Sequence, residues 1–209
     1  MADDSATATA GSKSERTRQR ILDSAAKVFR EQGYGARLTD IAEEAGMQAG
    51  SLYYHFDGRE SLVAEVLRLG VKSAFDQVRE AVEAVPAGAA PLQILEVGVR
   101  AAAATNLEVG DYAAANARVF PMVTEVVRKE HYALQQEYGD YLQDLLQAAV
   151  DAGELRADLD LAVIRMLLFG AMNWTTEWYR PDRGRSAQVV VDQLVDMVLG
   201  GLVSRDHNS

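Results

Sequence analysis

The side chains best suited to chemistry in this sequence lie in two stretches near its N-terminus. The first, within residues 13–30, places lysine and arginine along one side of a predicted helix. The second, residues 48–55, contains an amide, two small residues, a serine, two tyrosines and a histidine. Cations and hydroxyls bind phosphate oxygens, and an amide reads base edges. These residue types favour nucleic-acid recognition over covalent catalysis.

Composition and motifs argue against most enzyme and metal chemistry. The 209 residues include no cysteine and three histidines, which excludes thiolate nucleophiles and cysteine-bound metals and disfavours a histidine-rich metal site. The sequence holds no Gly-x-Ser-x-Gly, phosphate-binding loop, dinucleotide-binding glycine motif or Glu-x-x-His pair. We therefore predict a protein that is not an enzyme and needs no cofactor or metal, with an enzyme as the first alternative.

No segment of the sequence is suited to membrane insertion. The N-terminal stretch Met-Ala-Asp-Asp-Ser-Ala-Thr-Ala-Thr-Ala lacks the apolar core of a signal peptide, and no run of 18 apolar residues occurs. We therefore expect a cytoplasmic protein without a membrane partner.

Charge is distributed unevenly along the chain, whose net charge is −10. Residues 13–30 hold six basic and two acidic residues, a balance of +4, whereas residues 61–209 hold 13 basic and 21 acidic residues, a balance of −8. A positive end on a negative body would orient the molecule on a polyanion such as DNA. The alternative is that these cations only form the solvated face of a helix.

Apolar residues recur with helical period through most of the chain, and no segment shows sustained alternation, so we predict an all-α fold. Residues 1–12, which are rich in alanine, threonine and serine, are predicted to be a disordered arm. Helices are predicted over 13–33, 38–45, 48–56, 59–85, 92–107, 111–118, 122–152, 159–179 and 187–203. The segments 86–91 and 181–186, which contain proline, are predicted loops.

Two short helices joined at Gly46, after a longer amphipathic helix, form a helix-turn-helix pattern. Leu52 and Phe56 lie four residues apart and face inward on the second short helix. Its outer face is then composed of Gln48, Ala49, Gly50, Tyr53 and Tyr54.

The stretch that carries this pattern resembles the DNA-binding domain of TetR-family transcriptional regulators. The shared features are Ile-Leu-x-x-Ala-x-x-x-Phe, Gly-Tyr, Asp-Ile-Ala, Ala-Gly, Leu-Tyr-Tyr-His-Phe and Arg-Glu-x-Leu, in that order between residues 21 and 62. The resemblance implies a DNA-binding domain at 13–58 and a larger helical ligand-binding and dimerisation domain at 59–209, about nine helices in all.

The resemblance also implies a role for individual residues. Gln48, Ala49 and Gly50 would read bases in the major groove. The other implied DNA contacts are Arg16, Arg20, Arg37, Ser51, Tyr53, Tyr54, His55 and Arg59. Arg37 replaces the usual threonine or serine cap, so a cap hydroxyl is lost and a phosphate-seeking cation is gained. Packing within the helix is the alternative for His55.

An apolar stripe on the last predicted helix suggests a dimer interface. The resemblance implies dimerisation through the last two helices, and the stripe comprises Val191, Leu194, Val195, Val198 and Leu202. The alternative is that these residues belong to a monomeric core.

The helices between these two regions contain aromatic and methionine residues that suit an adaptable apolar pocket, although any core uses the same types. The candidate lining residues are Tyr112, Phe120, Met122, Tyr132, Met166, Phe169, Met172, Trp174 and Trp178, with Arg165 and Arg180 as candidate phosphate ligands. Residues 173–181 resemble regulators that answer to fatty-acyl or steroid-derived CoA thioesters.

We therefore expect a repressor that binds a (pseudo)palindromic, double-stranded operator as a homodimer. A small apolar effector would release it, with an acyl-CoA thioester as the candidate. The alternative is a DNA-bound adaptor of the same fold that responds to a protein partner.

Overall fold

The computed structural model describes the backbone of residues 4–108 and 110–203, and the side chains of residues 13–108 and 110–203. This part of the chain contains α-helices and short 3-10 turns but no named strand, which confirms the predicted all-α fold. The helices are α1 (Asp4–Gln32), α2 (Leu38–Glu44), α3 (Ala49–Leu52), α4 (Arg59–Glu83), α5 (Pro91–Glu108), α6 (Gly110–Val119), α7 (Glu125–Asp151), α8 (Leu161–Trp178) and α9 (Ala187–Leu202). None of the described helices is long and apolar enough to cross a membrane.

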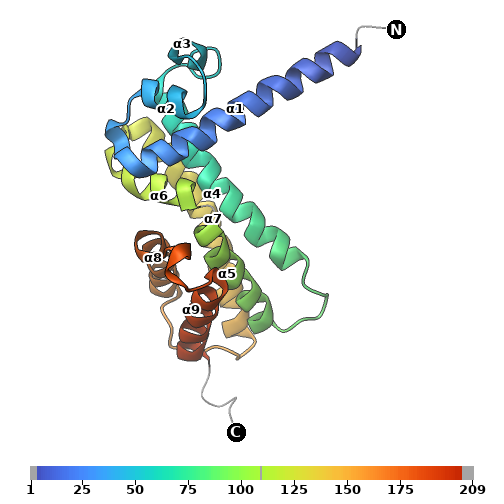
Figure 1. Cartoon of the computed structure of the whole chain (residues 1–209). Helices are drawn as coiled ribbons and strands as arrows, with labels where there is room; N and C mark the ends of the chain where they lie inside the picture. Colours follow the sequence, from blue (N-terminus) through green and yellow to red (C-terminus); the bar gives the residue numbers. More distant parts are fainter. Residues whose placement is uncertain (1–3, 109, 204–209) are drawn as a thin grey trace.

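The first helix begins earlier than the sequence predicted. The backbone of residues 4–12, expected to be part of a disordered arm, continues α1, which projects beyond the other helices in Figure 1. Three alanines occur in this stretch and no proline interrupts it, so no helix breaker of that kind ends the helix that begins in the amphipathic segment. Residues 1–3 of the expected arm lie outside the described residues.

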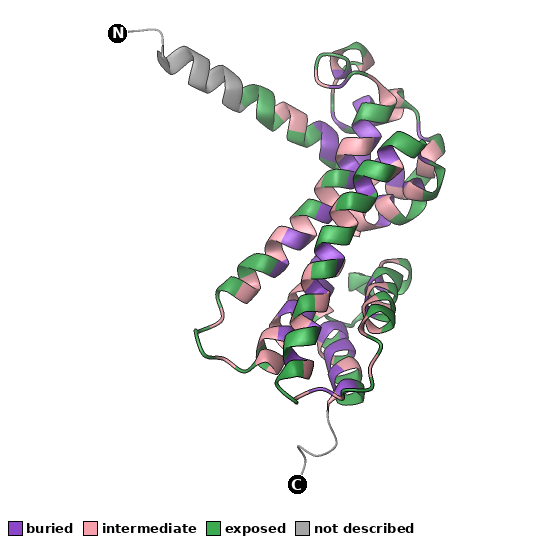
Figure 2. Cartoon of the chain, turned by 180° about the vertical axis from the view of Figure 1, so that it is seen from behind, coloured by how far each residue is buried: buried purple, intermediate pink, exposed green. Residues whose placement is uncertain are grey.

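Buried side chains form two cores, and α4 contributes to both (Figure 2). One core lies at the N-terminal end formed by α1, α2 and α3, the predicted DNA-binding end; it extends to Leu67 of α4 and includes Ala115 and Val119 of α6. The core of the body begins at Val71 and is built mainly from α4, α5, α7, α8 and α9. The division between cores therefore falls within α4, several residues after the boundary predicted at residue 58.

The apolar stripe predicted to form the dimer interface instead packs within the chain. Val191, Leu194, Val195 and Leu202 are all buried in the body core, and Val198 is half-buried against it. An ion pair between Arg100 of α5 and Asp192 holds α9 in this orientation. The prediction does not fit the four buried residues, because helical periodicity identifies an apolar face without identifying what covers it.

A different apolar face of the last two helices is exposed. Its residues are Val163, Met166, Leu167 and Trp174 on α8, and Val189 and Met197 on α9. Leu167 is 64% exposed and Met197 68% exposed, although both are large apolar side chains. Because a contiguous exposed apolar patch marks an interaction surface, these residues are the candidates for a contact with a second copy of the chain.

Candidate DNA interface and effector cavity

The predicted recognition helix is shorter in the structure than in the sequence analysis. The helix α3 contains only Ala49–Leu52, and Gln48 precedes it in extended backbone. Residues 53–55 form a turn, in which the His55 N–H donates to the Leu52 carbonyl at 2.9 Å. The prediction of helix through residue 56 was therefore wrong. Leu52 and Phe56 are both anchored in the core, and the chain must reverse before α4 begins.

The predicted base-reading and phosphate-binding surface is accessible. Tyr53 is 62% and Tyr54 is 90% exposed, as expected once Leu52 and Phe56 face inward. Gln48 and Gly50 are exposed, while Ala49, Ser51 and His55 are half-buried. Gly46 adopts φ 65° between α2 and α3, a conformation that glycine adopts without strain. This turn presents the segment 48–54 at the tip of the molecule (Figure 1).

Three of the predicted DNA-contacting arginines are exposed: Arg16, Arg20 and Arg37. Arg37 donates to both carboxylate oxygens of Asp40, at 2.8 Å and 3.2 Å. These hydrogen bonds hold the pKa of Asp40 below its usual value. As the sequence predicted, no side-chain cap hydrogen bond is present at the start of α2.

Arg59 occupies a different environment from the one expected. Its guanidinium donates to the carbonyl of Ala36 and lies over the rings of Tyr34 and Phe29, within the DNA-binding end. The prediction that this cation faces phosphate does not fit these contacts, because the group is already engaged inside the domain.

Arg18, for which no individual role was predicted, contacts both α4 and the core. Its guanidinium lies 4.9 Å from the Phe56 ring centroid and 2.9 Å from Glu65 of α4. Glu65 also accepts from Arg68, and these hydrogen bonds lower the pKa of Glu65 to about 2. At about 100° per residue, Arg18 lies on the opposite side of the helix from Arg16 and Arg20. This position was the signal in the sequence that Arg18 faces α4.

A cavity of about 560 Å³ lies between α4, α6, α7 and α8. Five of the predicted lining residues border it: Phe120, Tyr132, Arg165, Met166 and Phe169. The ring centroids of Phe120 and Tyr132 are 5.1 Å apart, and those of Tyr138 and Phe169 are 5.2 Å apart. Four aromatic side chains therefore contribute to the wall.

The other predicted lining residues lie elsewhere. Met172 is buried in the body core, and Trp174 and Trp178 face outward from α8 at 66% and 44% exposure. Met122 is exposed on the turn after α6, and Tyr112 lies against α1. The predictions for the three residues of α8 were wrong because a different helical face of α8, which includes Arg165, Phe169 and Asn173, borders the cavity. Tyr112 instead lines a second crevice, beside α1.

Polar residues in the cavity wall were missed by the sequence analysis. The amides are Asn106, Asn116, Gln135, Gln136 and Asn173. The buried Tyr138 also borders the cavity, and burial raises the pKa of its hydroxyl. Arg165 donates to Asp140 at 2.8 Å and lies close to Gly139, where a Cβ would stand 3.2 Å from its Nη1. An amide has no motif, so no sequence signal distinguished these residues from surface ones.

A buried histidine lies behind this wall. The His131 Nε2 is 3.3 Å from the Asn116 amide nitrogen, and its ring centroid is 4.7 Å from that of Phe120. Burial lowers the pKa of His131 to about 4, so the imidazole is neutral at physiological pH. Neutral His131 thus contributes packing and an amide contact instead of charge.

The helix α6 lies between the cavity and α1. One side of α6 borders the cavity through Ala113, Asn116 and Ala117. On another side the Tyr112 hydroxyl donates to Asp23 of α1 at 2.8 Å, and Gln19 donates to that hydroxyl at 3.2 Å. Burial and the nearby Asp23 carboxylate raise the pKa of the Tyr112 hydroxyl.

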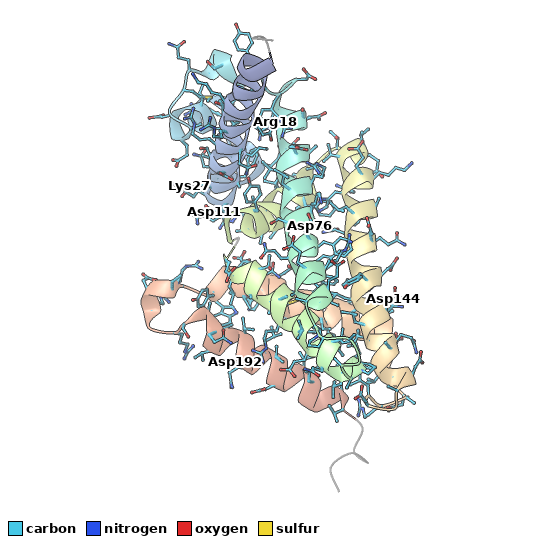
Figure 3. All side chains as sticks on the ribbon, turned by 90° about the vertical axis from the view of Figure 1, so that its right-hand side faces the viewer. Arg18, Lys27, Asp76, Asp111, Asp144 and Asp192 are labelled. Atoms are coloured by element: carbon cyan, nitrogen blue, oxygen red, sulfur yellow. The ribbon has the colours of Figure 1, made fainter. Side chains whose placement is uncertain are left out.

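Two further contacts join α6 to the end of α1. Arg30 forms an ion pair with Asp111, which Figure 3 labels on α6 below Lys27 of α1. Arg118 donates to the Glu31 carbonyl at 3.2 Å. A second crevice of about 920 Å³ is lined by residues of α1, α6 and the end of α8, among them Arg30, Arg118 and Arg180. Arg180 therefore lines this crevice and not the aromatic cavity.

Comparison with known proteins gives matches over both parts of the chain. The family described as "Bacterial regulatory proteins, tetR family" matches residues 21–66, and the family described as "Tetracyclin repressor-like, C-terminal domain" matches residues 88–202.

Individual relatives match the chain over nearly its whole length. The HTH-type transcriptional repressor KstR2 of Rhodococcus jostii (strain RHA1) is 32% identical over 206 residues, covering 96% of each chain. The structure of the ketosteroid transcriptional regulator KstR2 of Mycobacterium tuberculosis superposes with a TM-score of 0.79 at 27% identity, covering 90% of this chain and 95% of that one. AibR, solved with isovaleryl coenzyme A and operator DNA, shares the fold with a TM-score of 0.76 at 23% identity, over 87% of this chain and 97% of its own. Since the helix-turn-helix, the helical body and nearly the whole length of the sequence agree with these proteins, the chain belongs to the TetR family of transcriptional regulators.

Proposed function

We propose that this protein is a repressor that binds a (pseudo)palindromic operator as a homodimer and is released by a small effector with a large apolar part. The observation that carries the proposal is the position of α6, which borders the cavity and also contacts α1 of the DNA-binding end. An effector that moves α6 would therefore change the orientation of the DNA-binding end. A cavity of about 560 Å³ favours a small molecule over the protein partner of an adaptor.

The chemistry of the two cavities supports an acyl-CoA thioester as the effector class. Aromatic side chains suit an apolar acyl group, and the surrounding amides suit keto or hydroxyl oxygens on it. The adjoining crevice holds three arginines beside five carboxylates, so only its arginine side, which includes Arg118 and Arg180, suits phosphate groups. Asn106 borders both spaces. The relatives include a regulator named for ketosteroids and one solved with isovaleryl coenzyme A, which fits this class.

The proposal is tested in two steps. Duplex DNA selected by the protein from a random pool would supply the operator, and acyl-CoA thioesters would then be assayed for its release by fluorescence anisotropy. The matched control is the free acid of each thioester, which has the same apolar part without the CoA phosphates. Failure of every thioester to reduce operator binding would contradict the acyl-CoA assignment, and failure to select any duplex would contradict the repressor.

Base-reading and phosphate-binding positions should respond differently to substitution. Gln48→Ala is expected to relax preference at one base pair, at a cost of about 1–3 kcal/mol there, because it removes an amide from the exposed start of α3. Tyr53→Phe should weaken binding to all sequences alike, because a phosphate contact positions the protein without reading sequence. Affinities for a set of single-base operator variants would separate the two, and a uniform loss with Gln48→Ala would show that it reads no base.

Removing the hydroxyl that joins α6 to α1 should weaken communication between effector and DNA. Tyr112→Phe deletes the 2.8 Å hydrogen bond to Asp23 and keeps the ring. We expect operator binding by the free protein to persist, while the effector-induced loss of affinity falls from about 100-fold to about 10-fold. Gln136→Ala, a change in the cavity wall away from α1, is the control and should alter effector affinity instead. Unchanged release in Tyr112→Phe would place the coupling elsewhere.

A further inference from the structure

Arg59, the first residue of α4, makes three contacts within the protein, and none of them involves the surface that would face phosphate. The Arg59 guanidinium donates to the Ala36 carbonyl, lies 4.9 Å from the centroid of the Tyr34 ring and 6.0 Å from that of Phe29. Its Nη2 atom is buried and has no hydrogen-bond partner among the described residues. Cation–π attraction requires this face-on approach within about 6 Å. Arg59 as a whole is half-buried, so the protein engages one side of the cation.

The backbone before Arg59 directs it to this place. Gly58 adopts φ 115° and ψ −173° at the start of α4, in a region that only glycine occupies readily. The chain arrives there from Phe56, which is buried in the core. This turn positions the first residue of α4 over the segment 33–36 at the end of α1.

The segment that Arg59 contacts determines where α2 begins. Ala36 is fully buried, and its N–H donates to the Gly33 carbonyl at 3.2 Å. The next residue, Arg37, is the N-cap of α2 and provides no side-chain cap. A hydrogen bond from Arg59 to Ala36 therefore anchors the start of α2 at a point where the usual cap hydroxyl is missing. The position of α2 in turn sets that of α3, since the two are joined by the tight turn at Gly46, where the Met47 N–H donates to Ala42 at 2.9 Å.

We propose that Arg59 is a positioning residue for operator binding. It holds residues 34–36 against α1 and thereby sets the placement of α2 and the base-reading segment 48–54, without contacting phosphate. A planar guanidinium can donate to a carbonyl and stack on Tyr34 together, whereas the ammonium of lysine is a compact point charge that cannot stack as a plane. Lysine binds phosphate well, so the two roles predict opposite results for one substitution.

Arg59→Lys is therefore the decisive variant. Positioning predicts that operator affinity falls about tenfold, at a temperature where circular dichroism shows the variant folded. It also predicts that the discrimination between the selected duplex and a scrambled duplex of equal composition falls. A phosphate role predicts near-normal affinity and discrimination for Arg59→Lys. A role confined to stability predicts a lower melting temperature with normal affinity of the folded protein. Either of these results would overturn the proposal.

Salt dependence provides an independent readout with the uncharged variant Arg59→Gln. Loss of one phosphate contact should reduce the slope of log K against log salt by about 0.9, whereas loss of positioning should leave the slope unchanged. Tyr34→Leu is the matched variant, since it removes the ring beneath the guanidinium and leaves Arg59 in place. Its cost in operator affinity should be smaller in an Arg59→Lys background than in the wild type.

The contact is also testable without DNA, so its failure is distinguishable from failure of the proposed repressor function. Hydrogen exchange of the free protein should accelerate at residues 36–41 in Arg59→Lys, with unchanged exchange in α5 and α9. Unchanged protection at 36–41 would show that Arg59 does not hold the start of α2.

Discussion

Leu167→Asp combined with Met197→Asp is expected to produce a folded monomer that has lost operator binding. Both side chains are largely exposed in the isolated chain, at 64% and 68%, and lie on α8 and α9 within the exposed apolar face. A homodimer that uses this face would bury two carboxylates from each subunit without partners, at a cost of several kcal/mol for each charge. A dimer engages two half-sites, so its loss should reduce operator affinity by about 10²–10⁴-fold. Sedimentation velocity and fluorescence anisotropy would measure the two effects.

The control for this prediction is Val195→Asp. Val195 is only 2% exposed and belongs to the body core, so a carboxylate there should unfold the body instead of separating subunits. Circular dichroism would distinguish a folded monomer from an unfolded chain. A Leu167→Asp, Met197→Asp double variant that remains dimeric would show that the interface lies elsewhere, and a folded monomeric Val195→Asp would restore the stripe first predicted from the sequence.

Phe29→Ala is expected to destabilise the DNA-binding end by about 3–5 kcal/mol. Phe29 has no exposed surface and packs in the core that joins α1, α2, α3 and the first turns of α4. It also provides one of the two rings beneath Arg59. The substitution leaves a cavity and removes that ring, so operator binding should be lost with much of the body intact. Denaturant unfolding would measure the free energy, and hydrogen exchange would locate the loss.

Leu146→Ala offers a matched comparison in the other core. Leu146 is also fully buried but packs in the body with residues of α5, α8 and α9. A loss of about 2–5 kcal/mol is expected, with reduced protection centred on α5 and α7. If both variants reduced protection equally along the whole chain, the two cores would unfold as one cooperative unit.

Features of this protein that depend on neighbouring residues could be predicted from sequence, whereas features that depend on distant residues could not. The helix locations could be predicted from the spacing of apolar residues and from the glycine and proline residues at helix ends. Both signals, such as the turn at Gly46, depend on residues that are neighbours in sequence. The same local information identified the exposed tyrosines, since Leu52 and Phe56 must face inward if the segment folds at all. The recognition helix ended early at Leu52 because the chain reverses toward α4, a requirement of the tertiary arrangement.

The all-α class, the helix-turn-helix and the polar face of residues 48–54 could be predicted from sequence, because each depends on residues within a few positions of one another. Three features depend on contacts between distant segments: the stripe of α9 that α5 covers, the face of α8 that borders the cavity, and the direction in which Arg59 points. A periodic pattern reports that a face is apolar but not what covers it. Arg59 lies over the rings of Tyr34 and Phe29. These two residues belong to a different helix and turn, some 25–30 residues earlier in the chain, so the neighbours of Arg59 in sequence do not indicate the contact.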